Sequence, residues 1–131
     1  MRRIGIVSGA LWLTACSGWG GAQTTTVDGY TAALQTKPAP LQVGAPGELR
    51  LSLVQDGEPA EGCVVTFRQH MPGMEMSSDN AVVTMGDTGG GVYTGASSEY
   101  TMGGDWRIEV TFTCAGQART AAFDYTLEWP E

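Results

Sequence analysis

Residues 106–114 read Trp-Arg-Ile-Glu-Val-Thr-Phe-Thr-Cys, so apolar and polar side chains alternate without a break. Successive side chains of a β-strand point to opposite faces of the sheet. The alternation therefore places Trp106, Ile108, Val110, Phe112 and Cys114 on one face, and charged or hydroxylated residues on the other. This stretch predicts a strand with one face on a hydrophobic core and the other in water.

Further runs along the chain read as strands separated by turns. These runs are residues 48–53, 62–69, 80–87, 92–98 and 118–128. Their connections are rich in Asp, Gly and Pro, and residues 89–91 are three glycines that join two of the runs. No window shows a helical period of apolar residues. We predict one all-β domain over residues 40–131, an immunoglobulin-like β-sandwich of about seven strands.

The first residues predict export. Arg2 and Arg3 precede an apolar run over residues 4–13, which is too short to span a bilayer and fits the core of a signal peptide. The following Leu13-Thr14-Ala15-Cys16 resembles the lipobox of bacterial lipoproteins, in which the chain is cut before an acylated cysteine. We expect residues 1–15 to be a lipoprotein signal peptide and Cys16 to carry the lipid. The alternative is an ordinary secretory signal that is cleaved elsewhere.

A lipidated Cys16 would hold the protein on the cell envelope, facing the periplasm. The residue after it is Ser17 and not Asp, which favours the outer membrane if the bacterium has two membranes. Residues 16–39 show no period and end with Pro38 and Pro40. This composition predicts a flexible tether between the lipid and the domain.

The charge of the chain excludes some partners. The sequence has 7 Lys and Arg against 14 Asp and Glu, a net charge of −7. Removal of residues 1–15 takes away Arg2 and Arg3 and leaves 5 basic against 14 acidic side chains, or −9. We expect no nucleic-acid partner. An anionic membrane would repel the domain, so its attachment must come from the lipid.

Two cysteines remain besides Cys16. Cys63 and Cys114 lie on the apolar faces of their strands, in a chain exported to an oxidising compartment. We predict a disulfide that crosses the core between two stacked sheets. Closing a loop of about 52 residues stabilises a fold by up to ~4 kcal/mol in the loop-entropy model. A metal site with two thiolate ligands is the alternative.

Residues 70–76, His-Met-Pro-Gly-Met-Glu-Met, contain the only histidine and three methionines. Thioether sulfurs are soft, neutral ligands that suit Cu(I), and an imidazole also accepts Cu(II). We predict a copper site made by His70, Met74, Met76 and Met102, with Cu(I) favoured. For His70, a surface histidine is the alternative. For Met102, it is packing at the sandwich edge.

Other residues near this loop have more ordinary readings. We expect Met71 to pack against the strand end, because the following Pro72 holds it there, and Met85 to lie on a core face. Glu75, Asp79 and Asp87 are candidates to attract a cation to the loop, although acidic loop residues commonly serve only to solvate a surface.

Three segments together resemble a known family. Residues 71–74 (Met-Pro-Gly-Met), 91–95 (Gly-Val-Tyr-Thr-Gly) and 102–110 are similar to the YtkA-like domain family, which is related to FixH-like domains, over about residues 40–128. The resemblance implies a small exported immunoglobulin-like β-sandwich, found on lipid anchors or beside copper-handling and heavy-metal efflux components. It matches Met74 and Met102 most directly. The cysteine pair is outside the family pattern and implies added bracing.

The sequence offers no catalytic arrangement: it has one histidine, no inferable Ser-His-Asp geometry and no glycine-rich phosphate loop before a helix. We therefore expect no enzyme. The leading hypothesis is a copper-binding lipoprotein, a periplasmic chaperone or resistance buffer. The alternative is a non-catalytic interaction module, without metal, whose methionine loop contacts an efflux or oxidase-assembly membrane protein. A purely structural envelope domain is a third reading.

The lipobox gives a direct prediction. Cys16→Ser removes the thiol that the lipid would modify, so the precursor should stay unlipidated and uncut at this position. Incorporation of a labelled fatty acid, followed by mass spectrometry of the N-terminus, measures both effects. A variant that is still cut after Ala15 and still bound to membranes would contradict the lipobox.

Overall fold

The computed structural model describes residues 18–74 and 81–130, which contain nine β-strands. The strands are β1 (Gln23–Val27), β2 (Tyr30–Lys37), β3 (Glu48–Gln55), β4 (Glu58–Pro59), β5 (Val64–His70), β6 (Val83–Gly89), β7 (Val92–Ala96), β8 (Gly104–Cys114) and β9 (Gln117–Leu127). The all-β prediction is confirmed, and the six predicted runs correspond to β3 and β5–β9. No helix in the described ranges is long and apolar enough to span a membrane.

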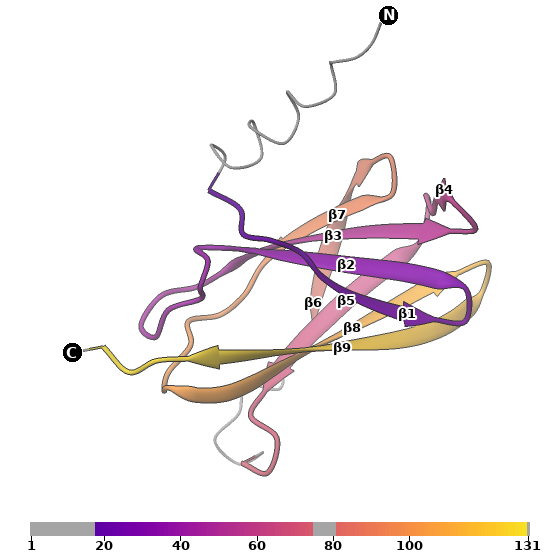
Figure 1. Cartoon of the computed structure of the whole chain (residues 1–131). Helices are drawn as coiled ribbons and strands as arrows, with labels where there is room; N and C mark the ends of the chain where they lie inside the picture. The colour runs from indigo at the N-terminus through magenta and orange to yellow at the C-terminus, as the bar shows by residue number, and fades with distance from the viewer. Residues whose placement is uncertain (1–17, 75–80, 131) are drawn as a thin grey trace, which may run out of the picture.

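The strands form one antiparallel sheet in the order β1-β2-β3-β7-β6-β5-β8-β9, with β4 paired to β3. The sheet curls until its first and last strands lie side by side (Figure 1). Gln23 Nε2 donates a hydrogen bond of 2.8 Å to the carbonyl of Asp124, and Thr25 Oγ1 donates one of 3.3 Å to that of Ala122. Side chains thus join the two edges, and the result is a nearly closed sandwich.

The core lies inside this curl. The inward residues of β8 are at most 7 % exposed, as the alternation predicts. They pack with aromatic residues of other strands, and Tyr100 meets the Trp106 ring edge-on at a centroid distance of 5.2 Å. Met71 and Met85 are each 4 % exposed, so the packing predicted for Met71 and the core position predicted for Met85 are confirmed.

Within the described residues, the predicted flexible tether over residues 16–39 is wrong. Residues 23–37 form β1 and β2, and the whole of β2 pairs with β3. Tyr30, Ala32 and Leu34 alternate into the core with exposures of 4 %, 0 % and 0 %. Five threonines in residues 23–37 made the alternation of apolar residues hard to recognise, although Thr favours strands. The domain therefore begins well before residue 40.

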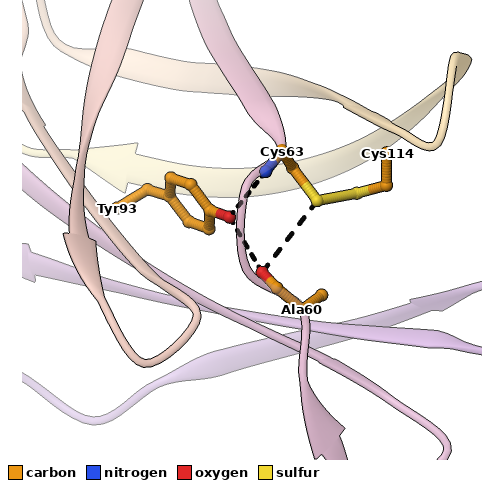
Figure 2. The surroundings of a disulfide bond; sticks show 4 residues. All are labelled: Ala60, Cys63, Tyr93 and Cys114. Atoms are coloured by element: carbon orange, nitrogen blue, oxygen red, sulfur yellow. Dashed lines mark hydrogen bonds between the residues drawn. A yellow bond between two sulfur atoms is a disulfide. The ribbon is translucent and has the colours of Figure 1, made fainter.

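The disulfide between Cys63 and Cys114 is present, but it joins neighbouring strands (Figure 2). Val64 pairs with Thr113 in the β5–β8 ladder, so the two cysteines face each other at its end, with their Cα atoms 4.6 Å apart. The predicted bridge across two stacked sheets was wrong, because inward-facing cysteines can also be neighbours in one sheet. The hydroxyl of Tyr93 accepts from the Cys63 amide at 3.1 Å and donates to the Ala60 carbonyl at 2.8 Å, which fixes the approach to β5.

The two ends of the sandwich differ. One end has the tight turns between β1 and β2, β3 and β4, β6 and β7, and β8 and β9. The other end, which we call the methionine end, consists of residues 18–22, 38–47, 71–74, 97–103 and 128–130. In Figure 1, residues 18–22 lie at the upper left in indigo, and the loop after β5 lies at the bottom. An isolated bridge between Val43 and Tyr100 ties two of these segments together.

Burial of β2 leads to a stability prediction. Leu34→Ala should lower the free energy of unfolding by about 2–5 kcal/mol, because it leaves a cavity in a fully packed core. Urea denaturation measures the change. Thr24→Ala, at an exposed site in the neighbouring β1, is the matched control and should change stability by at most about 0.5 kcal/mol. Equal stability of Leu34→Ala and the parent would contradict the assignment of β2 to the core.

Candidate metal centre

The loop after β5 divides its methionines between core and solvent. The amide of Met74 donates to the carbonyl of Met71 at 2.9 Å, which closes a turn through Pro72 and Gly73. Gly73 has a φ of +83°, a conformation that favours glycine. Met71 is buried, whereas Met74 is 46 % exposed. The turn therefore presents one thioether to solvent.

Met102 reaches the same end from the other direction. It lies in the segment between β7 and β8 and packs, partly buried, against the core. Its carbonyl accepts a hydrogen bond of 2.9 Å from Trp106 Nε1. A Cβ at Gly104, two residues later, would lie 2.8 Å from Met71 Cε, so the Met71 and Met102 segments are close neighbours. The structure thus brings Met74 and Met102 to one end of the sandwich.

His70 is placed differently. It is in the outward phase of β5, opposite Arg107 of β8, yet its side chain is only 7 % exposed. Its Nε2 lies 3.3 Å from Glu109 Oε2, and the other carboxylate oxygen of Glu109 lies 2.9 Å from Arg68 Nη2. The sequence pattern did not indicate Glu109 as the partner of His70. The pairing of Glu109 with His70 follows from the register of β5 against β8, and the alternation within each strand does not specify that register.

The acidic side chains that could attract a cation lie in different parts of the structure. Asp124 lies beside Arg107, with Nε and Oδ1 2.8 Å apart, and this hydrogen bond holds the pKa of the Asp124 carboxyl below its usual value. Asp87 is not at the methionine end. It caps the irregular end of β6, where its carboxylate accepts from the Gly89 amide at 2.9 Å. Glu75, Met76 and Asp79 lie outside the described residues, as does Cys16.

The donor atoms limit which metals this end suits. Over residues 18–74 and 81–130, no group of three or more His, Cys, Asp or Glu side chains could hold a metal ion. Burial raises the pKa of Tyr100 to about 12 and also raises that of Tyr125, which disfavours both phenolates. Met74 presents an accessible soft thioether at this end, where Glu99 and Glu128 are exposed carboxylates. Because no three such carboxylates gather in the described ranges, hard cations such as Mg²⁺ and Ca²⁺ fit poorly here.

Three comparisons place the chain among known proteins. A family model described as YtkA-like matches residues 24–111, which includes β1 and β2 and so begins earlier than the resemblance expected from sequence. The comparison with curated proteins gives no match. Among solved structures, the chain is similar to a copper-bound variant of FetP from uropathogenic Escherichia coli, with a TM-score of 0.52 and 9 % identity over 85 % of this chain and 92 % of that chain. At this identity, the likeness shows a shared fold.

The exposures of the methionines predict their reactivity. Hydrogen peroxide should oxidise Met74 well before Met71 and Met85, because the two core sulfurs are shielded from the reagent. Peptide mass spectrometry at short reaction times measures sulfoxide at each position. Oxidation of Met71 or Met85 as fast as that of Met74 would contradict the burial described above.

Proposed function

Because the chain belongs to the YtkA-like family, we propose that it is an exported copper-binding domain that holds the metal at its methionine end and passes it on. The single observation that carries this proposal is the 46 % exposed Met74 at the end that also contains Met102. A flexible apolar side chain in such a position is well suited to a soft metal. The similar FetP variant, which is copper-bound, supports the same reading.

The proposed ligands are Met74, Met76 and Met102, with His70 as a fourth. Three neutral thioethers favour Cu(I), which accepts soft ligands and needs no anionic donor. His70 can join them only by exchanging the contact between its Nε2 and Glu109 Oε2, unless the metal binds at Nδ1. The thioethers are therefore the primary ligands, and His70 is a secondary ligand.

The proposal includes a place in the cell. The signal peptide would direct export, and the lipid on Cys16 would keep the domain on the periplasmic side of the envelope, at the outer membrane if two membranes are present. The role is non-catalytic. A weakly held, surface-exposed Cu(I) suits a chaperone or a resistance buffer, since both must release the metal to a partner.

The main alternative is an interaction module without metal. Its support is that Met74 and Trp129, which are 46 % and 61 % exposed, both lie at the methionine end. Exposed methionine and tryptophan are enriched where proteins meet. In this reading the loop contacts an efflux or oxidase-assembly membrane protein through apolar packing, and its sulfur atoms are dispensable.

A double substitution separates the two functions. Met74→Leu with Met76→Leu keeps approximate volume and apolarity but removes two sulfurs. Anaerobic titration with Cu(I) against a chromophoric chelator should show an affinity at least about tenfold lower, or ~1.4 kcal/mol. Binding by the parent should persist to about pH 5, because thioethers have no proton to lose.

The matched control removes two sulfurs from the core instead. Met71→Leu with Met85→Leu should leave Cu(I) affinity unchanged, and circular dichroism should show that both double variants stay folded. If the parent binds no copper, or the loop variant binds as tightly as the parent, the copper function is excluded and the interaction module takes its place.

A further inference from the structure

The N-terminal strap, residues 18–22, is fixed to the methionine end. Its Gly20 amide donates to the Thr36 carbonyl at 3.1 Å, and Gln35 Nε2 donates to the Gly20 carbonyl at 2.9 Å. A Cβ at Gly20 would lie 2.4 Å from the Cβ of Ala39, so the strap passes too closely for any larger residue. In Figure 1 the strap, in indigo, leads directly into β1.

Trp19 secures the beginning of the strap. The Arg50 guanidinium lies 4.6 Å from the centre of its ring, and Lys37 Nζ lies 5.9 Å from it. Arg50 is itself held by two hydrogen bonds to Gln35 Oε1, of 3.1 and 2.9 Å. Cation–π contacts of this kind contribute about 0.5–1 kcal/mol or more each. The chain is therefore anchored to the domain from Trp19 onward.

Because the strap is fixed from Trp19 onward, a lipid on Cys16 would lie a short distance from the domain. Three residue steps separate Cys16 from Trp19, and they span at most ~10 Å even when fully extended. We propose that the methionine end lies directly against the surface of the lipid bilayer, at the level of the headgroups. The inference rests on the lipid anchor at Cys16 that forms part of the proposed function.

The chemistry of the methionine end fits a bilayer surface. Trp129 is 61 % exposed and stands over Gly103, where an added Cβ would lie 2.7 Å from its ring. Tryptophan favours the boundary between headgroups and acyl chains. Beside it, Leu41, Val43 and Pro130 contribute to a hollow of about 250 Å³. The occupant of this surface is lipid, and Glu128 on the rim of the hollow makes zwitterionic lipid a better fit than anionic lipid.

This orientation narrows the choice of metal partner. Met74 and Met102 would face the membrane, while the tight turns at the opposite end would face the periplasm. Copper would then be exchanged with a membrane-embedded protein or at the bilayer surface. A periplasmic partner that approaches the turn end from the bulk phase would find none of the proposed ligands there.

Fluorescence quenching tests the orientation without copper. The lipidated protein, purified from membranes, is reconstituted in phosphatidylcholine vesicles whose acyl chains carry bromine. The difference between the parent and Trp129→Phe reports on Trp129 alone. We expect brominated lipid to quench this signal, and insertion of about twelve Gly and Ser residues after Ser17 to reduce the quenching about twofold or more, because the domain can then leave the surface.

A second probe controls for general proximity. Gln117→Trp places a tryptophan at the turn end, and its added signal should not be quenched. Equal quenching of Trp129 with and without the insertion, equal quenching at the two ends, or a protein without lipid on Cys16 would each overturn the proposal. Protection of Trp129 in native membranes but not in vesicles would also overturn it, in favour of a membrane-protein partner. Since no copper is used, failure here is independent of the copper titration.

Discussion

β8 pairs along its length with β9 and over most of it with β5, and its inward row is almost completely excluded from water. Full burial of each large apolar side chain in this row contributes about 1.5–3 kcal/mol. A slip of one residue would turn Ile108 and Val110 to solvent and bring Arg107 and Glu109 into the core. Only one register of β8 therefore buries its apolar row, and this register fixes how β5 and β9 pair with it.

That register also determines the surface chemistry. It sets Glu109 opposite Arg68 and Asp124 opposite Arg107, so the outer face carries compensated ion pairs. It also brings the end of β5 and the beginning of β8 together, and with them the segments that contain Met74 and Met102. The methionine end is thus a consequence of strand pairing, although the residues that form it are distant in sequence. The tight turns at the opposite end contain no methionine or histidine.

Sequence alone could predict what depends on the alternation within one strand. It identified β3 and β5–β9, the packing of Met71, the core position of Met85, and the partnership of Cys63 with Cys114. It failed where the answer depends on which strands are neighbours. The disulfide joins adjacent strands because β5 pairs with β8, and His70 meets Glu109 for the same reason. β1 and β2 were missed because Thr24, Thr25 and Thr26 fill β1 and two more threonines lie in β2, and a threonine is ambiguous between a polar loop and a strand.

Because residues 23–37 are strands and not a flexible tether, a lipid on Cys16 would be held close to the domain. With residues 1–15 removed, the chain would carry a net charge of −9, so electrostatics would drive it away from anionic lipid. Lys37 and Arg50 lie against the Trp19 ring, where they hold the strap. Orientation would then follow from the short covalent path between lipid and strap. Since that path contains no charged side chain, salt should not release the domain from a surface of zwitterionic lipid, unlike proteins held by polybasic patches.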